Sequence, residues 1–345
     1  PPPAPHRSFG GRNSMSSMRS DVFGRLQTAL LALLFALAFF PSCGDDDGTQ
    51  DEESATLHDD TNANVPACGA TYVNTEAGKG SQQFIGRMEM PRLVPGDIFI
   101  VHQTTDITSR PVNFSVAYNA EKLHSRWVAF RFDATMNQKN VARKDYDIRP
   151  KYPRDPLCSA TPTSDASFGG HDHGHLCASA DRLCSRVSND QTFYMSNMSP
   201  QIGSFNQQYW TKYEQFVQTL GRACTADKNG YRWADTLYVV KGGTIDDGQT
   251  LGTVSVDKKR MPVPKYYFIA LLTVKNQVYS SIAFWVEHSE YDSGKVLKND
   301  RDEVMAHAIS VDELERRTGI DFFCNLSGTL EHKVESTYMS AAWEN

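Results

Sequence analysis

The sequence lacks several patterns that would assign it to a common class of protein. No CxxC pair is present, which argues against a zinc ribbon, and no helix-turn-helix or zinc-finger pattern appears, which argues against a sequence-specific DNA reader. The longest apolar run, residues 29–40, is shorter than the about 20 residues that a membrane-spanning helix needs. Internal repeats are absent, and only one acidic segment is of low complexity. What remains is a globular chain with about 280 residues available for folding, which suits one large domain.

The N-terminal segment has the features of an export signal. Arg19 and Arg25 precede the apolar run 29–40, and Cys43 follows it directly after a serine. A small residue before a cysteine resembles a bacterial lipoprotein box, which implies cleavage before Cys43 and acylation of its thiol. An ordinary secretory peptide with an incidental cysteine is the alternative. We therefore expect residues 1–42 to comprise the signal peptide and the residues upstream of it.

An extended acidic linker is predicted after Cys43. Eight acids and no Lys or Arg occur between Cys43 and Asp60, and such a block repels itself. It resembles the acidic stretch that follows the lipid-bearing cysteine in surface-exposed lipoproteins of the Bacteroides type. The resemblance implies an exported protein tethered to the bacterial cell envelope, at the outer membrane or the cell surface. We place the linker at residues 43–67 and the folded domain at residues 68–345.

The folded part of the chain carries almost no net charge. The whole chain has a formal charge of −6; the eight linker acids and a charge of +3 in the presequence leave −1 for residues 61–345. A near-neutral domain attracts a polyanion only through a local patch. Residues 121–155 hold nine bases against five acids, so this stretch is the candidate patch. An ordinary solvated face is the equally good alternative.

The cysteines beyond Cys43 are even in number. An even count in an exported chain permits up to three disulfides, whose pairing the sequence does not determine. The six residues are Cys68, Cys158, Cys177, Cys184, Cys224 and Cys324.

Alternating and β-branched segments predict a chain rich in strands. The expected strands are residues 83–92, 97–103, 112–118, 126–132, 192–198, 236–240, 266–274 and 280–286. Residues 144–166 are rich in Pro, Asp, Ser and Arg and predict a charged loop.

The clearest helical pattern covers residues 205–220. Apolar side chains recur there at spacings of mostly three or four, and Gly221 stands where a C-terminal glycine belongs. Ser204 or Asn206 could cap the start of this helix. A second, shorter helix is predicted at residues 311–318, directly before a glycine.

The densest cluster of titratable side chains is the segment His-Asp-His-Gly-His at 171–175. Asn-Met-Ser-Pro-Gln follows at 197–201, then Asn206, and then Trp210 and Glu214 on the predicted helix. This ordered set resembles the signature of the DNA/RNA non-specific endonucleases, in which Asp-Arg-Gly-His, an Asn-Met-x-Pro-Gln-like strand end and a helix opened by Asn form a ββα-metal finger. The likeness extends over roughly residues 80 to 335. It implies an α+β fold whose central antiparallel sheet carries this finger.

The resemblance implies Mg²⁺-dependent hydrolysis of DNA and RNA, with Mn²⁺ as a possible substitute. An imidazole, with a pKa near 6.5, suits a general base, and the resemblance gives this role to His175. It makes Asn206 the single protein ligand of a hard divalent ion that keeps several waters. Glu214 lies about 12 Å further along the helix, so we expect it to hold metal-bound water. We expect Asn197 to orient the site and Asp172 to fix either the finger or the histidine.

Two positions depart from the family pattern. His173 stands where the family has Arg, and Gln218 stands where a second Arg is common. Both arginines would neutralise phosphate charge in the transition state. A protonated His173 could replace the first, and Arg182 or Arg222 could bind substrate in place of the second. The sequence therefore predicts lower activity than usual or a more acidic optimum.

Two other functions remain open from the sequence. On an extended strand, His171, His173 and His175 would project to one face and could bind Zn, Cu or Ni, as in a transition-metal binding lipoprotein. Alternatively, a catalytically weakened nuclease-like lipoprotein would capture DNA through residues 121–155. The oligomeric state does not follow from either interpretation.

Overall fold

The structure is a computed structural model that describes residues 71–72, 82–108, 112–144, 147–292 and 301–344. These residues belong to one compact unit, Thr56–Asn345. The predicted signal peptide, Cys43, most of the acidic linker and Cys68 lie outside the described residues. Within the described part of the chain, no helix has the length and apolar character needed to cross a membrane.

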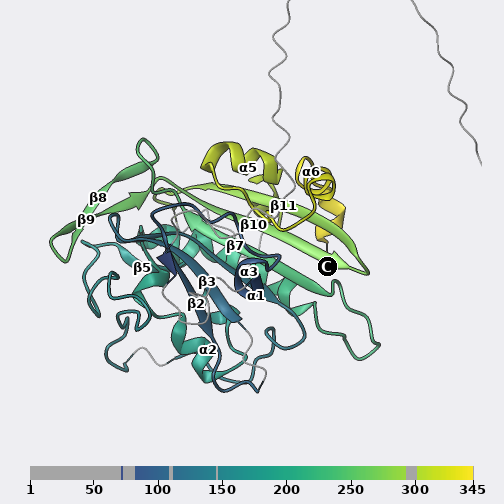
Figure 1. Cartoon of the computed structure of the whole chain (residues 1–345), viewed down its shortest axis with the longest axis horizontal. Helices are drawn as coiled ribbons and strands as arrows, with labels where there is room; N and C mark the ends of the chain where they lie inside the picture. The colour runs from purple at the N-terminus through teal and green to yellow at the C-terminus, as the bar shows by residue number, and fades with distance from the viewer. Residues whose placement is uncertain (1–70, 73–81, 109–111, 145–146, 293–300, 345) are drawn as a thin grey trace, which may run out of the picture. The chain divides into compact units, whose positions relative to one another are not determined.

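An eight-stranded sheet forms the centre of this unit (Figure 1). The strand order is β1-β2-β3-β4-β7-β10-β11-β12, and every neighbouring pair is antiparallel except the parallel pair β1 and β2. The predicted α+β fold with a central antiparallel sheet is therefore confirmed. The strands are β1 (Thr71–Tyr72), β2 (Ile98–Gln103), β3 (Val112–Asn119), β4 (His124–Phe132), β7 (Thr236–Gly243), β10 (Tyr266–Lys275), β11 (Val278–Glu287) and β12 (Ala308–Ile309).

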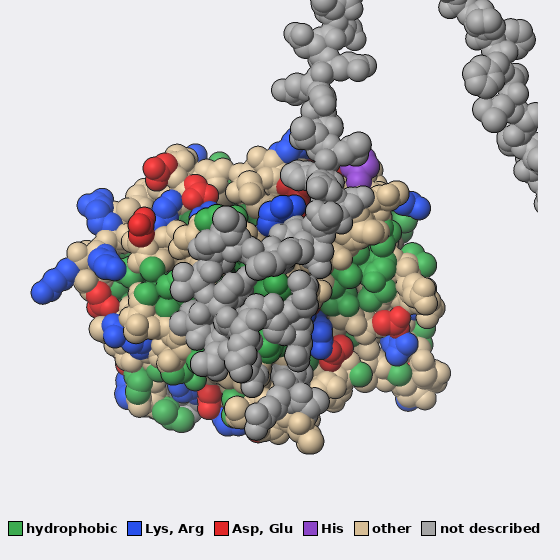
Figure 2. All heavy atoms as spheres, viewed as in Figure 1, with side chains coloured by type: hydrophobic (Ala, Val, Ile, Leu, Met, Phe, Trp, Pro, Cys, Tyr) green, Lys and Arg blue, Asp and Glu red, His purple; other side chains and the backbone are tan. Residues whose placement is uncertain are grey.

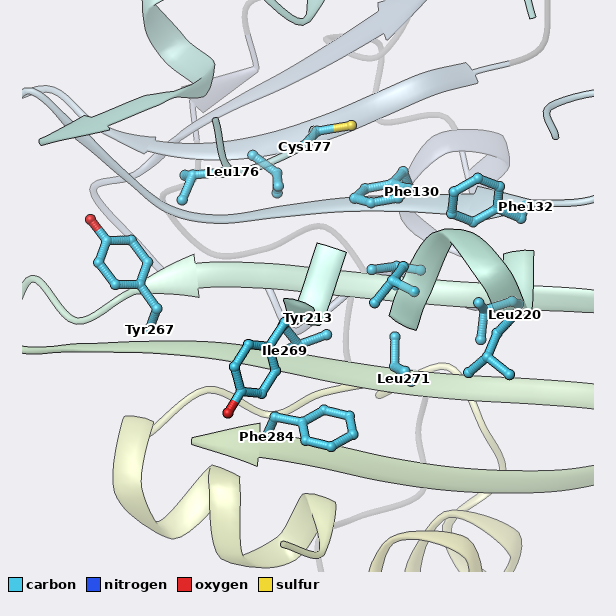
Figure 3. Packing of buried hydrophobic residues seen from close by; sticks show 14 of the residues in the cluster. Phe130, Phe132, Leu176, Cys177, Tyr213, Leu220, Tyr267, Ile269, Leu271 and Phe284 are labelled. Carbon is cyan, nitrogen blue, oxygen red and sulfur yellow. The ribbon is translucent and has the colours of Figure 1, made fainter. Parts of the chain in front are cut away.

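Helices cover both faces of the central sheet. On one face, α3 (Trp210–Arg222) packs against β4, β10 and β11 through Tyr213 and Leu220 (Figure 3). On the other face, α5 (Val311–Thr318) and α6 (Gly328–Glu335) bury apolar side chains against the same strands. Successive side chains of a strand point to opposite faces. The central strands are consequently apolar on both sides, and β10 is buried over seven of its ten residues.

Two antiparallel hairpins lie outside the central sheet. The first pairs β5 (Asp172–His175) with β6 (Met198–Gln201), and the second pairs β8 (Thr250–Val256) with β9 (Lys259–Pro264). The remaining helical segments are short. They are α1 (Gln82–Ile85), η2 (Ser179–Asp181), α2 (Arg186–Gln191), η3 (Met195–Asn197), η4 (Phe205–Tyr209), α4 (Arg301–Met305) and η5 (Ser340–Trp343).

Six of the eight predicted strands are present, as β2, β3, β4, β7, β10 and β11. The prediction of a strand at 83–92 is wrong, because the chain forms the short helix α1 there. At 192–198, the expected strand is replaced by the 3₁₀ turn η3, and β6 begins only at Met198. β6 includes Pro200, which fits because the hairpin has two strands and one side of β6 needs no ladder donor.

The predicted helix at 205–220 begins as a π-helix, η4, and continues as α3. It runs through Gly221 and ends at Arg222, so the prediction that Gly221 terminates it is wrong. A Cβ atom at Gly221 would lie 2.5 Å from Cγ of Phe132. Glycine there allows α3 to approach β4 closely. The second predicted helix is confirmed as α5, which is capped by Ser310 and ends at Gly319 in the left-handed conformation.

The disulfides that the sequence permits are not formed by the cysteines that the structure describes. Cys158, Cys177, Cys184, Cys224 and Cys324 are all buried, and none of them is in a disulfide. The thiols of Cys224 and Cys324 donate to the backbone carbonyls of Leu220 and Met90, respectively. These cysteines therefore act as small apolar residues of the core.

Candidate active site

The motif predicted from 171–175 forms β5, and its partner strand is β6. Asp172 pairs with Gln201 and His175 pairs with Met198, so the two segments of the motif lie side by side. A Cβ atom on Gly174 would overlap the side chain of Gln201. The glycine of the motif is thus required by the close approach of β6, and the hairpin leads directly through η4 into α3. This ββα arrangement is the predicted finger.

His175 lies at the end of β5 with 8% of its surface exposed. Its ring meets the ring of Phe193 edge-on, with the centroids 5.0 Å apart. Burial is the main cause that lowers its pKa to about 3, and the positive charge of Arg143 contributes. Nε2 is buried and makes no hydrogen bond. At neutral pH, His175 therefore presents a neutral imidazole with an uncommitted nitrogen.

Asn206 lies in the π-helix η4 and is joined to Asp172. Its Nδ2 donates to Oδ2 of Asp172 over 2.9 Å, and Nε2 of Gln207 donates to the same oxygen over 2.7 Å. Ser204 makes no capping hydrogen bond either, so neither proposed cap is used. Because the amide nitrogen of Asn206 is held by Asp172, its carbonyl oxygen is the end left to bind another group. π-Helical turns are frequent at functional sites.

Glu214 lies on α3, half-buried, next to a buried ion pair. Burial raises the pKa of Glu214 to about 7, while the positive charge of Lys241 opposes the rise and the negative charge of Asp181 adds to it. Nζ of Lys241 lies 3.4 Å from Oδ2 of Asp181, and both side chains are fully buried. Arg143 also lowers the pKa of Glu214, so one guanidinium acts on both Glu214 and His175.

Arg143 is a site residue that the sequence did not single out. Its Cζ lies 5.9 Å from the centroid of the Phe193 ring, against which His175 also packs. The sequence did place Arg143 in the candidate basic patch, since it is one of nine bases in the stretch 121–155. Nothing in that stretch distinguishes it from the other eight, because its closeness to His175 depends on a loop joining distant parts of the chain.

The basic stretch 121–155 does not form a patch of one sign. Lys122 and Arg126 pair with Asp246, and Arg131 pairs with Asp133. On the face shown in Figure 2, the basic and acidic side chains of the described residues are interspersed. The bases that act on His175 are Arg143 and Lys151. Within residues 121–155, the candidate surface for binding nucleic acid is therefore the loop beside His175.

His173 is held as a structural side chain. Its ring is stacked between Tyr152 and Phe168, with both centroids 4.2 Å away. Its Nε2 donates to the carbonyl oxygen of Ala166 over 2.8 Å, and burial lowers its pKa. A neutral, sandwiched imidazole does not supply the positive charge that the sequence analysis expected from it. The prediction that His173 replaces an arginine is corrected accordingly.

The two arginines expected to bind substrate point into the protein. Arg182 is fully buried, donates to the carbonyl of Arg131 and packs over the rings of Phe130 and Phe132. Arg222 donates to the backbone carbonyls of Asn137 and Ala180. Both guanidinium groups thus bind backbone carbonyls of segments that pack near α3. The fully buried Arg182 is therefore not placed to contact substrate. Substrate binding by the half-buried Arg222 stays a prediction.

Asn197 anchors the turn that follows His175. Its side chain accepts from the backbone N–H of Cys177 and donates to the carbonyls of Cys177 and Thr192, over 2.7–2.8 Å. It is fully buried. These contacts hold the end of β5 against the start of β6. The role of Asn197 in orienting the catalytic site stays a prediction.

Two further histidines position the hairpin, and the sequence analysis did not identify them. Nδ1 of His288 donates to the carbonyl of Pro264, and Nε2 accepts from the N–H of Ile202. His124 donates to the carbonyl of Ser125 and binds Ser199 through Nε2 over 2.6 Å. Burial lowers the pKa of each to about 4. Isolated histidines in unrelated segments gave no sequence signal for this role.

The three histidines of the motif do not form a metal cluster. Nδ1 of His171 faces the carbonyl of Phe168, and Nε2 of His173 is held by Ala166. Among the described residues, three or more His, Cys, Asp or Glu side chains close enough to hold one ion occur at a single place, far along the chain in α5 and α6. The geometry therefore does not support a transition-metal site at 171–175.

Comparison with known proteins decides the family. A family model described as DNA/RNA non-specific endonuclease matches residues 94–329, which is well over half of the chain. The chain belongs to this family. As a DNA/RNA non-specific endonuclease, it is a phosphodiester hydrolase that acts on nucleic acids, as the sequence predicted.

Two nucleases similar in sequence agree with this assignment. Nuclease C1 of Cunninghamella echinulata var. echinulata is 25% identical over 217 residues, covering 62% of this chain and 81% of the relative. A nuclease of Nostoc sp. is 28% identical over 228 residues, covering 65% and 75%. A chain from the crystal structure of an EndoG/EndoGI complex aligns at 20% identity with a TM-score of 0.48, covering 66% of this chain and 86% of that chain.

Enzymes of the DNA/RNA non-specific endonuclease family typically depend on a metal ion. The residues of this chain fit a hard divalent cation, which prefers oxygen ligands and retains several waters. Asn206 offers its carbonyl oxygen because its nitrogen is bound to Asp172. Glu214 offers a carboxylate whose raised pKa reflects burial. A single amide oxygen as protein ligand suits an ion that is mostly hydrated.

Proposed function

We propose that this enzyme cleaves DNA and RNA at the β5–β6–η4 site, with His175 as the general base and Asn206 as the protein ligand of Mg²⁺, for which Mn²⁺ can substitute. One observation carries the proposal. His175 is neutral and its buried Nε2 has no partner, while Asn206, fixed by Asp172 from the same strand, has its carbonyl oxygen available. A proton acceptor and a cation ligand are thus held by one hairpin and the helical turn after it.

In this scheme, each side chain has a defined task. Nε2 of His175 accepts the proton of the attacking water. The low pKa of the free imidazole rises when an anionic phosphate lies next to it, which favours this transfer. Arg143 donates to the phosphate, and Glu214 accepts hydrogen bonds from water near Asn206. When bound, the divalent ion stabilises negative charge on the phosphate and the leaving oxygen.

A digestion assay with plasmid DNA and RNA tests the proposal. We expect His175→Ala and Asn206→Ala each to reduce the initial rate by at least about 10²-fold, in line with the loss of a general base or an electrostatic stabiliser. EDTA should abolish wild-type cleavage. The exposed variant Asn229→Ala is the matched control and should retain the wild-type rate. Unchanged rates in both site variants would refute the assignment.

A weakened, DNA-capturing module is the second candidate, because Arg182, one of the two arginines expected to bind substrate, is fully buried. It would bind DNA in a salt-sensitive manner without cutting it. The same wild-type protein, assayed for binding and for cleavage in Mg²⁺ and in Mn²⁺, separates the two. Binding without cleavage under both conditions favours the module, whereas cleavage favours the enzyme.

We further propose that the enzyme is exported and attached to the bacterial cell envelope through a lipid on Cys43. The apolar run 29–40, the serine before Cys43 and the acidic linker support this proposal. Metabolic labelling with a fatty acid, followed by cell fractionation, tests it. We expect label on the wild-type chain and its loss in Cys43→Ser. Label retained by Cys43→Ser, or an unlabelled wild-type chain, would contradict the anchor.

A further inference from the structure

α5 and α6 lie next to each other (Figure 1), on the face of the sheet opposite to α3. Carboxylates of the two helices gather at one place. Asp312 and Glu315 lie three residues apart on α5 and thus on neighbouring positions of one helix face. Glu335 is the last residue of α6. One carboxylate oxygen from each of the three lies within 4.8 Å of the others. Three negative charges therefore converge from two helices on one point.

Glu335 is the least expected member of this cluster. Only 2% of its surface is exposed, and its Oε1 is buried without a hydrogen-bond partner. Burying an ionised carboxylate without a compensating partner is costly. The four largest charge effects on Glu335 all come from carboxylates, Glu315 first.

The basic side chains near the cluster are engaged with other acids. Arg316 and Arg317 both pair with Glu313, on the other side of α5. Arg92 pairs with Asp321, with Nε and Oδ2 2.6 Å apart. In the part of the chain that the structure describes, no ion pair involving Glu335 is found. The positive charges of His332 and Arg316 act on Asp312, so the missing partner is that of the buried Glu335.

We propose that Asp312, Glu315 and Glu335 bind a calcium ion that joins α5 to α6. Ca²⁺ takes oxygen ligands at 2.3–2.6 Å, so two ligands on opposite sides of the ion are about 4.8 Å apart, and it tolerates irregular geometry. Mg²⁺ demands a tighter octahedron at about 2.0–2.1 Å. Glu315 also accepts from the backbone N–H of Phe322, which fixes its carboxylate in place. Water would complete the coordination.

The proposed ion has a structural task distinct from catalysis. It lies on the opposite side of the sheet from His175 and Asn206, which approach α3. α5 and α6 cover β11 and contribute Val311, Leu314 and Val334 to the second apolar cluster. Neutralising the repulsion between the two helices would stabilise their packing on the sheet. We therefore expect calcium to affect unfolding, independently of the divalent ion used in cleavage.

Thermal unfolding of the full chain after EDTA treatment, with and without calcium chloride, tests the proposal. We expect the Tm to rise with calcium concentration, as it does for any ligand that binds only the folded state. Glu335→Gln should abolish this rise because it removes the carboxylate of one of the three proposed ligands. Asp312→Asn, at a less buried position, provides a second variant with the same expected loss.

Two controls locate the ion. Glu313→Gln removes a carboxylate of the same helix that is paired with arginines, and Asn206→Ala removes the proposed catalytic ligand. Both should retain the calcium-dependent rise, and calorimetric titration of Asn206→Ala should show one bound calcium per chain. A wild-type Tm that does not respond to calcium, a response lost in Asn206→Ala, or a response retained in both cluster variants would overturn the proposal.

Discussion

The charge state of a few side chains determines what the site can do. His175 is neutral in the folded protein because its burial lowers its pKa, and Arg143 reinforces this effect. The same guanidinium opposes the protonation of Glu214. Arg143 therefore adds to the effect of burial on the pKa of His175 and, after Lys241, opposes the rise in the pKa of Glu214. It is in addition a candidate for contact with the phosphate.

Replacing Arg143 by Ala should reduce cleavage strongly. Loss of a single donor that stabilises transition-state charge costs about 10²–10³ in kcat. Arg154, an exposed base of the same stretch that has no marked effect on His175, provides the control, and Arg154→Ala should stay within about threefold of the wild type. Initial rates on plasmid DNA measure both. Equal rates for the two variants would show that Arg143 has no special part.

Replacing His173 by Phe should leave the pH profile of cleavage unchanged. Phenylalanine preserves the stack between Tyr152 and Phe168, and the imidazole is already neutral because burial lowers its pKa. The expected rate is within about threefold of the wild type, as befits a side chain that contacts no phosphate. Rates measured between about pH 5.5 and 8 check this. A loss confined to the acidic end would restore a charged role for His173.

At the scale of elements, the β5–β6 hairpin depends on a glycine, Gly174, because there is no room for a side chain at this position. Gly174→Ala should destabilise the protein by about 1–3 kcal/mol, the usual cost of overpacking, because the new Cβ would overlap Gln201. The double variant Gly174→Ala/Gln201→Ala removes the overlapping group and should recover part of the loss. Urea unfolding measures both. No recovery in the double variant would mean that the strain lies elsewhere.

The sequence predicted the elements whose pattern is local. β2, β3, β4, β7, β10, β11 and α5 follow from alternation, periodicity and caps within each segment. The failures arise where distant residues decide. Gly221 lies inside a helix because Phe132 packs on it, and Met195–Asn197 forms a turn because Asn197 is bound to Cys177 and Thr192.

The residues of the candidate site likewise fall into those that a local sequence pattern indicates and those that only the fold brings together. The ordered motif singled out His175, Asp172, Asn206 and Glu214 as candidates, because their spacing along the chain is itself the signal. Arg182 was misjudged. Counting from the motif suggested it, but it is fully buried and held by a backbone carbonyl. Arg143 could be recognised only after a loop had brought it to Phe193.

For the whole molecule, acid stability should be limited by histidines. His124, His175 and His288 have folded-state pKa values of about 4, 3 and 4, below the usual 6.5. Because these values are depressed, the unfolded chain takes up protons first. The free energy of unfolding is therefore not reduced by these histidines above about pH 6.5, and it falls as the pH falls toward 4. The pKa values of Glu214 and Glu335 are raised in the folded protein, so their protonation increases the free energy of unfolding as the pH falls.

The variant His288→Gln isolates one of these contributions. Glutamine can donate to Pro264 and accept from Ile202, as His288 does, but it does not titrate. Between about pH 6.5 and 4, the free energy of unfolding should fall less steeply in the variant, by up to about 1.4 kcal/mol per pH unit. Urea unfolding at several pH values gives both slopes. Identical slopes would show that His288 is not protonated on unfolding.

The π-helical turn η4 joins the β5–β6 hairpin to α3. The number of residues in this turn therefore matters as much as which residues they are. Each α-helical residue advances by 100° around the axis. Deleting one residue of the Gln207-Gln208 pair would let the turn relax to an ordinary helix, and Asn206 would swing by about that angle away from Asp172 while every active-site side chain remained in the sequence. Insertions and deletions in this turn are therefore expected to be tolerated less well than substitutions in it.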